Sequence, residues 1–116
     1  MAILRHLART HGLSGKTEAE QTRCDIAIEA IRDADHSLGS IVWTPGFEEN
    51  RGSFIENDLP VHLIPLERFL AASPTRGSFW AGESISLADL IALGYLENTE
   101  ALFPGALSAT ERLAEF

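Results

Sequence analysis

One side of a long predicted helix carries side chains that could take part in chemistry. They combine acids, an imidazole, a hydroxyl and an indole at intervals of four, three, four and three residues, and they are Glu29, Asp33, His36, Ser40 and Trp43. Residues three and four apart project from the same side of an α-helix. This row, here named the polar stripe, could line a polar cleft beside an apolar pocket. A helix face that is only solvated has the same pattern, so both interpretations stay open.

The other reactive residue types favour structural roles. Cys24 is the single cysteine and lies among the apolar positions of the same helix, so we predict a buried small side chain rather than a nucleophile. The histidines lack the spacing of metal ligands, and we expect no metal site; they are His6, His11, His36 and His62. The sequence contains no P-loop, dinucleotide fingerprint or G-x-S-x-G motif.

Composition and charge narrow the class of protein. Hydrophobic residues make up 45% of the chain, which is enough for one folded domain with a real core. The net charge of −8 argues against a nucleic-acid surface, and no apolar run is long enough to suggest a membrane span. A reducing compartment, the cytoplasm, fits the single cysteine. The basic stretch 1–16 resembles a mitochondrial presequence in composition, although an ordinary amphipathic helix has the same pattern.

The elements that must position these residues are all predicted to be helices. Apolar positions recur at helical spacing, no segment alternates as a strand does, and an all-α bundle follows. We expect helices over about 1–10, 18–43, 53–72 and 87–98, and a fifth from about 109 to the end. Pro60 and Pro65 fall inside the third of these. Because proline removes an amide donor, we expect a kink there, or a true helix start only at Pro60.

Four capping boxes mark the predicted helix starts. In this motif a Ser or Thr accepts a hydrogen bond from the amide three residues on, and an acid at that position reaches back. The pairs are Thr17 with Glu20, Ser53 with Glu56, Ser86 with Asp89, and Ser108 with Glu111. We therefore assign structural capping to Ser86 and Asp89, and expect Asp89 to be a folding residue rather than a catalytic acid.

Three segments add a resemblance to a known family. They are Ala-Ile-Leu-Arg-His-Leu-Ala-Arg at 2–9, Gly-Glu-Ser-Ile-Ser-Leu-Ala-Asp at 82–89, and Phe-Pro-Gly-Ala-Leu at 103–107. Together they resemble the C-terminal helical domain of glutathione S-transferases, and the stretch 17–47 is most similar to the mu class. The resemblance implies that residues 1–15 are the last helix and linker of a missing thioredoxin-like domain. Residues 16–116 would form the helical domain, incomplete at its C-terminal end.

The resemblance also implies roles for the polar stripe. Asp33 matches a residue that reaches glutathione bound in the neighbouring subunit, and His36, Ser40 and Trp43 match positions that face the electrophile pocket. Trp43 stands where the family usually has a tyrosine, so chemistry that needs this hydroxyl is in doubt. Arg5 matches a residue at the dimer interface.

The implied function is transfer of glutathione to small hydrophobic electrophiles, a detoxification reaction, by a full-length homodimer. Glutathione is a co-substrate, and no cofactor is expected. The group that stabilises the glutathione thiolate belongs to the missing domain, so this chain holds no catalytic residue and is expected to be inactive alone. No nucleic acid or membrane is expected among its partners. The alternative is a non-catalytic interaction or structural module, because fold does not determine function.

Overall fold

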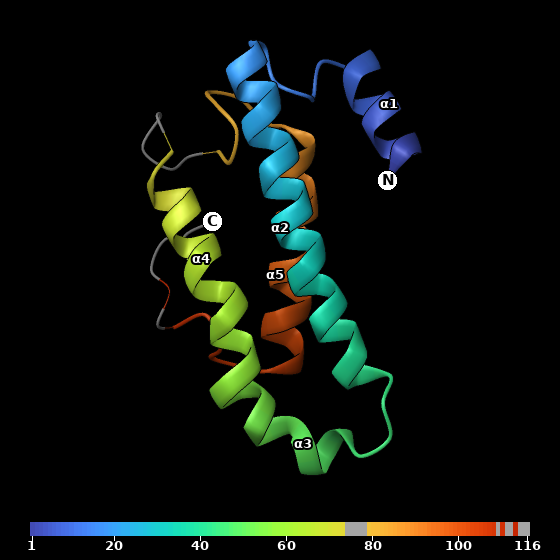
Figure 1. Cartoon of the computed structure of the whole chain (residues 1–116), viewed down its shortest axis with the longest axis vertical. Coiled ribbons are helices and arrows are strands. Elements are labelled where there is room, and N and C mark those ends of the chain that lie inside the picture. Colours follow the sequence, from blue (N-terminus) through green and yellow to red (C-terminus); the bar gives the residue numbers. More distant parts are fainter. Residues whose placement is uncertain (74–78, 109, 111–112, 114–116) are drawn as a thin grey trace.

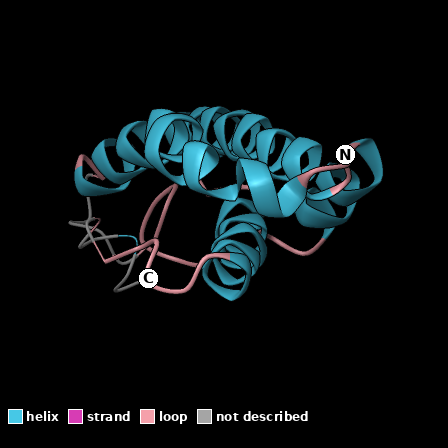
Figure 2. Cartoon of the chain, turned by 90° about the horizontal axis from the view of Figure 1, so that it is seen from below, coloured by secondary structure: helices cyan, strands magenta, loops and turns pink. Residues whose placement is uncertain are grey.

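The chain folds into a small bundle of helices, as predicted. The computed structural model describes residues 1–73, 79–108, 110 and 113, and none of these lies in a strand. The elements in order are α1 (Ala2–Thr10), α2 (Glu18–Val42), α3 (Phe47–Ser53), the π-helical turn η1 (Phe54–Asp58), α4 (Leu59–Ala71) and α5 (Leu87–Leu102). In Figure 1, α2 and α4 run antiparallel, α5 lies behind them, and α1 stands to one side. The helices α2 and α4 form one layer and α5 lies in a second, and Figure 2 shows both layers from below.

The first two helices begin and end where the sequence predicts. Gly12 follows α1 with a φ of 71°, and the Leu13 amide donates to the Ala8 carbonyl at 2.7 Å, which closes the helix end. At the start of α2, Thr17 Oγ1 accepts from the Glu20 amide at 3.1 Å. The Glu20 carboxylate accepts in return from the Thr17 amide at 3.3 Å. This capping box is confirmed.

The predicted capping box at Ser53 is wrong. Ser53 has helical φ and ψ angles and is the last residue of α3, so no helix begins there. The helix instead begins at Phe47 and continues through Ser53, because this places Phe47 and Phe54 against the buried ring of Phe103. The ring centroids lie 6.1 and 5.4 Å from that of Phe103. Burial of these rings outweighs a local capping signal.

The predicted irregularity occurs at Pro60, whereas Pro65 does not interrupt its helix. Immediately before Pro60 the helix widens into η1, where the Leu59 amide donates to the Phe54 carbonyl five residues back. A wide turn of this kind is one way to accommodate a residue that has no amide hydrogen. Figure 1 shows the axis bending between α3 and α4. Pro65 lies within α4, which continues to Ala71.

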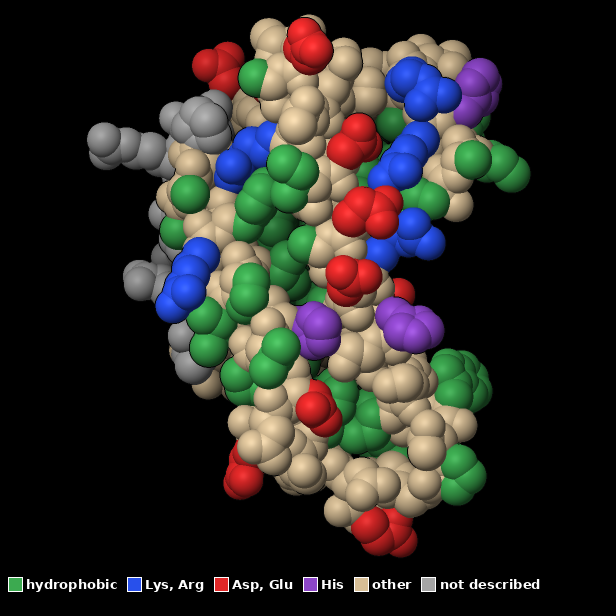
Figure 3. All heavy atoms as spheres, viewed as in Figure 1, with side chains coloured by type: hydrophobic (Ala, Val, Ile, Leu, Met, Phe, Trp, Pro, Cys, Tyr) green, Lys and Arg blue, Asp and Glu red, His purple; other side chains and the backbone are tan. Residues whose placement is uncertain are grey.

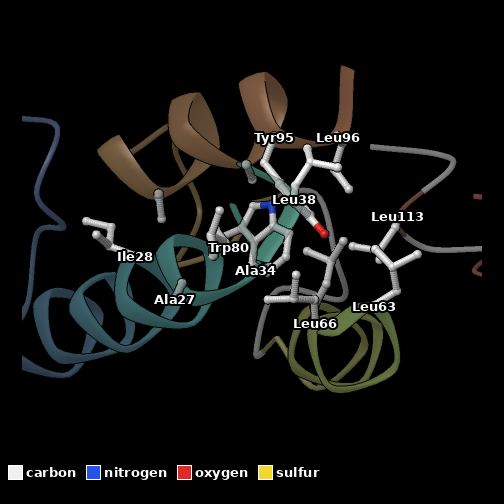
Figure 4. Close-up of a cluster of buried hydrophobic side chains, with 14 of the residues drawn as sticks. Ala27, Ile28, Ala34, Leu38, Leu63, Leu66, Trp80, Tyr95, Leu96 and Leu113 are labelled. Atoms are coloured by element: carbon white, nitrogen blue, oxygen red, sulfur yellow. The ribbon is translucent and has the colours of Figure 1, made fainter. Parts of the chain in front are cut away.

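The core fills the space between α2, α4 and α5. Trp80, from the segment before α5, is fully buried and lies at its centre (Figure 4). Apolar side chains surround it from all three helices; they include Ala27, Ile31, Ala34, Leu38, Leu63, Leu66, Leu70, Tyr95 and Leu96. Burying a large apolar side chain stabilises the fold by about 1.5–3 kcal/mol. Cys24 is 2% exposed and belongs to this core, as predicted.

The fourth predicted helix is confirmed and runs further than expected. α5 begins at Leu87 after the cap residue Ser86 and ends at Leu102, beyond the predicted end at residue 98. The predicted fifth helix lies outside the described residues, apart from Thr110 and Leu113, and so does Glu111 of the last capping box. Among the described residues, no helix is both long and apolar enough to cross a membrane.

Candidate functional site

The polar stripe lies on the face of α2 that points away from the core. α2 is regular from Glu18 to Val42, so the spacing of the stripe places its members on one side. Asp33, His36, Ser40 and Trp43 are all exposed, and Trp43, directly after the helix, is 86% exposed. An exposed indole of this size in a chain with a complete core beneath it is available for contact with something else.

His36 borders a hollow of about 450 Å³, here named the His36 hollow. It lies where the beginning of α1, the middle of α2 and α5 meet. Its wall is mixed: charged and polar groups face apolar side chains from α5, and the lining consists of Met1, Arg32, Asp35, His36, Leu90, Ile91, Gly94, Tyr95 and Asn98. Its volume falls within the range of small-molecule sites, but its wall is more polar than is usual for them.

Ser40 borders a different hollow of about 370 Å³, between the end of α2 and the α3–η1 segment. Its lining is mostly polar and uncharged, and consists of Ser37, Ser40, Ile41, Asn50, Ser53, Phe54 and Asp58. Asp33 and Trp43 line neither hollow. The structure therefore keeps the stripe on one helix face, but His36 borders a hollow that it shares with α5, and Ser40 borders one that it shares with α3 and η1.

Arg5 connects α1 to the acidic side of α2. Its Nη2 lies 2.5 Å from Glu29 Oε1, and its Nε lies 3.6 Å from Asp25 Oδ1. The hydrogen bond from Arg5 lowers the pKa of the Glu29 carboxyl, and the charges of Arg32 and Arg5 act in the same direction. In Figure 3 the basic side chains of α1 face a column of acids along α2. Sequence reasoning missed this pairing. The signal that could have revealed it is the basic charge of residues 1–16 together with Asp25 and Glu29, two acids one turn apart on α2.

Asp89 has the folding role predicted for it, with one partner more than expected. It is 3% exposed. Its Oδ2 accepts from the Ser86 amide and the Ser86 hydroxyl, both at 2.8 Å, and its Oδ1 accepts from the Trp80 amide at 3.0 Å. The same carboxylate therefore caps α5 and holds the segment that carries Trp80 into the core.

Arg23 is a second structural residue that sequence reasoning missed. Its guanidinium carbon lies 3.9 Å from the centre of the Phe69 ring, and its Nε donates to the Trp80 carbonyl at 2.9 Å. Nη2 donates to the Phe69 carbonyl near the end of α4. Burial lowers the pKa of this guanidinium. Arg23 thus ties α2 to α4 and to the Trp80 segment.

Within the described part of the chain, no group of three or more His, Cys, Asp and Glu side chains could hold a metal ion. The groups present are suited to binding a ligand. They are the exposed carboxylate of Asp33, the imidazole of His36 at the edge of the His36 hollow, and the exposed indole of Trp43. A carboxylate can bind a ligand's ammonium group, and an indole presents a flat apolar face with one N–H donor.

Comparison with known proteins gives this geometry a family. Residues 32–116 match the family described as glutathione S-transferase, C-terminal domain. Glutathione S-transferase Mu 1 of Oryctolagus cuniculus is 35% identical over 115 residues, which are 99% of this chain and 50% of that protein. A glutathione S-transferase of Dirofilaria immitis is 36% identical, over 99% of this chain and 55% of that protein. The chain spans about half the length of the curated relatives it matches.

Solved structures agree with these sequence matches. A pi-class glutathione S-transferase of Onchocerca volvulus superposes with a TM-score of 0.90 at 32% identity, over 97% of this chain and 54% of that one. A sigma-class enzyme of Fasciola hepatica gives a TM-score of 0.89 at 30% identity, over 100% of this chain and 56% of that one. The arrangement of the helices is therefore the one found in about half of each of these proteins.

Proposed function

The chain belongs to the glutathione S-transferase C-terminal domain family, and from this premise we propose that it is the acceptor-binding half of an enzyme that conjugates glutathione to hydrophobic electrophiles. Residues 1–15 would be the last helix and linker of a thioredoxin-like half, and residues 16–116 the helical domain. In this proposal the full-length enzyme is a cytoplasmic homodimer in which glutathione serves as co-substrate and no cofactor is required.

The observation that carries the proposal is the position of the His36 hollow. Met1, at the beginning of α1, and His36, on the polar stripe, line the same hollow. A domain joined to the beginning of α1 would therefore start beside the stripe. Apolar side chains stand exposed on α1 and α5, which contact each other; they are Ile3, Leu4, Leu7, Leu90 and Leu93. A packed neighbour would bury this surface.

We assign the polar stripe by the same reasoning. Asp33 would hold the amino group of glutathione bound to the partner subunit, since its exposed carboxylate can accept a charge-assisted hydrogen bond. His36, at the His36 hollow, and Ser40, at the separate hollow beside α3, would border the two ends of the acceptor pocket along one helix face. Trp43 would form a flat wall for aromatic acceptors, because an indole cannot exchange a proton as a phenol does. Arg5 would lie at the dimer interface while it keeps α1 against α2.

The isolated chain is expected to be inactive. The reactive species is the glutathione thiolate, and its stabilisation is assigned to the thioredoxin-like half. The helical half would contribute position, holding the acceptor against that sulfur. An experiment should therefore supply the other half.

The test joins the part of the rabbit Mu 1 relative that precedes its match to residue 1 to this chain, so that residues 1–15 supply the last helix of the thioredoxin-like half. We expect the chimera to conjugate glutathione to chlorodinitrobenzene, while the chain alone does not. Asp33→Asn should raise the KM for glutathione by about fivefold, the effect of losing one exposed charge contact, with little change in kcat.

Glu48→Gln is the matched control, because Glu48 is an exposed acid on α3 that does not belong to the polar stripe. A folded chimera without activity toward any electrophile would contradict the proposal and favour an interaction module. If Asp33→Asn and Glu48→Gln behave alike in an active chimera, the assignment of Asp33 is wrong.

A further inference from the structure

The charged residues that line the His36 hollow differ in whether their charge is balanced. Two side chains with a full charge line it, Arg32 and Asp35. Arg32 belongs to a group of two arginines and two acids, in which Glu29 lies 3.6 Å from Arg32 and 2.5 Å from Arg5, and Asp25 lies 3.6 Å from Arg5. Asp35 makes no ion pair within the described part of the chain. The unbalanced charge of the hollow is therefore the carboxylate of Asp35.

The charge of Asp35 acts on the opposite wall of the His36 hollow. Burial raises the pKa of the Tyr95 phenol on α5 to about 12, and the negative charge of Asp35 acts in the same direction. Salt screens the field of an exposed charge within about 10 Å, so this effect places Asp35 close to α5. Asp35 is itself exposed, and a ligand can reach its carboxylate from solvent.

The α5 wall of the His36 hollow has an open notch that suits a flat ring. Leu90, Gly94 and Asn98 follow one another at intervals of four residues, so they share one side of α5, and all three line the hollow. A Cβ atom at Gly94 would meet no other atom within 4 Å, so the space between Leu90 and Asn98 is open. Leu90 is 46% exposed and offers an apolar surface at one end of this notch.

We propose that the preferred acceptors of the enzyme are aromatic electrophiles that carry a positively charged ammonium group, which Asp35 binds. This inference rests on the proposed function, because it names the acceptor of the same site. The ring would lie in the notch at Gly94, and the ammonium would donate a charge-assisted hydrogen bond to the Asp35 carboxylate.

The reaction itself would be an aromatic substitution. The glutathione sulfur forms a bond to the ring carbon that carries a halide, and the halide leaves with the electron pair of the broken bond. The ammonium group takes no part in this exchange, so it affects only how well the acceptor is bound and placed. An acceptor with a carboxylate at the same position would be repelled by Asp35.

The test uses the chimera described above, in which residue 1 has no free amino group that could compete for Asp35. Three chloronitrobenzenes share one reacting carbon and carry, opposite the chlorine, an aminomethyl, a hydroxymethyl or a carboxylate group. Each kcat/KM at neutral pH is divided by the uncatalysed rate constant with glutathione, which removes the effect of the substituent on reactivity. The ammonium compound should exceed the neutral alcohol by about fivefold, and the carboxylate should be the poorest acceptor.

Substitutions at Asp35 should change this order without changing the fold, because the side chain is exposed. Asp35→Asn should remove the preference for the ammonium compound, and Asp35→Lys should reverse the order in favour of the carboxylate. Added salt should reduce the preference of the unmodified chimera. Glu97→Gln is the matched control, because Glu97 is an exposed acid on α5 that does not line the His36 hollow; it should keep the full preference.

A second measurement does not need turnover. In the ¹⁵N-labelled chimera, benzylammonium should shift the Gly94 amide signal saturably and bind about fivefold more tightly than benzyl alcohol. Turnover of the neutral acceptor without any charge preference would overturn this inference and leave the proposed function intact. So would an unchanged preference in Asp35→Asn. A folded chimera that converts no acceptor contradicts the proposed function, and equal binding of the two benzyl compounds would then overturn the role of Asp35 as well.

Discussion

At the scale of single residues, two buried polar side chains of this chain differ sharply in the number of hydrogen bonds that they make. The Asp89 carboxylate accepts three hydrogen bonds in a site that is 3% exposed. By contrast, the hydroxyl of Tyr95 is buried and has no hydrogen-bond partner within the described residues. The three hydrogen bonds of Asp89 stabilise the fold strongly, whereas the buried hydroxyl of Tyr95 resists ionisation.

Replacement of Asp89 by alanine should lower the free energy of unfolding by about 3 kcal/mol, because the Trp80 and Ser86 amides lose their buried acceptor. Urea unfolding followed by circular dichroism measures this change. Glu97→Ala, an exposed acid on the same helix, should change the stability by less than about 0.5 kcal/mol. Equal effects of the two replacements would remove the assigned role of Asp89.

Tyr95 should titrate far above an ordinary tyrosine. Burial raises its pKa from 10.0 to about 12. In the unfolded chain the phenol therefore loses its proton first, so the contribution of Tyr95 to stability is complete below pH 10.0 and is lost as the pH rises toward about 12.

Tyr95 is the only tyrosine of the chain, so the near-ultraviolet absorbance of tyrosinate reports it alone. The midpoint should be near 12 in the folded chain and near 10.0 in urea. Tyr95→Phe supplies the baseline for both titrations. A midpoint near 10.0 in the folded chain would show that the hydroxyl is not buried as described.

At the scale of elements, the start of α2 packs closely against the segment before α5, where the Glu20 side chain lies against the backbone of Gly82. A Cβ atom at Gly82 would clash with Glu20 Oε1. The other carboxylate oxygen, Oε2, accepts from the Lys16 amide at 2.7 Å. A Cβ atom at position 82 would therefore displace the Glu20 carboxylate from its capping position, and the φ of Gly82 itself is not unusual.

Gly82→Ala should destabilise the chain by about 1–2 kcal/mol, because the Glu20 carboxylate must move off the amides that it caps. In a chain that already carries Glu20→Ala, the same replacement should cost much less, since the clashing group is gone. The double-mutant cycle, measured by urea unfolding, should give a coupling of about 1 kcal/mol. Additive effects would contradict the clash.

At the scale of the whole molecule, the bundle has a buried apolar core but also leaves large apolar side chains exposed on its surface. Trp80 and its neighbours are buried, yet α1 and α5 leave apolar side chains exposed, and one of them, Leu90, lines the His36 hollow. Such a surface is typical of a contact with another domain.

The exposed apolar surface should make the isolated chain self-associate. Leu93 is 44% exposed on α5, and Leu93→Glu should raise the dissociation constant for self-association by about fivefold or more, through lost apolar contact and added charge. Sedimentation equilibrium measures this constant. Ile64→Glu, on the exposed side of α4, is the control of similar exposure at 46%. If both variants act equally, the apolar surface of α1 and α5 is not the contact.

The helices and most of their starts could be read from the sequence. The capping boxes at Thr17 and Ser86 and the stop at Gly12 depend on contacts within a few residues, and all three are present in the structure. The failure at Ser53 has the opposite cause: Phe47 and Phe54 pack against Phe103, some fifty residues away, and override the local signal.

The candidate site was predicted less completely. Helical spacing was sufficient to place the polar stripe on one face of α2. It was not sufficient to show that His36 shares a hollow with α5 while Ser40 shares one with α3 and η1, because that depends on which helices pack beside each turn. The pairing of Arg5 with Glu29 and the acceptance by Asp89 from Trp80 likewise join distant elements.

The all-helical class, the helix ends set by local caps and the family of the chain can all be read from the order of its residues. Which side chains meet across helices, where the hollows lie and which apolar faces stay uncovered depends on how the helices pack. The physical reason is range: periodicity and caps act over three or four residues, whereas hollows and long-range pairs arise when helices far apart in the chain pack together.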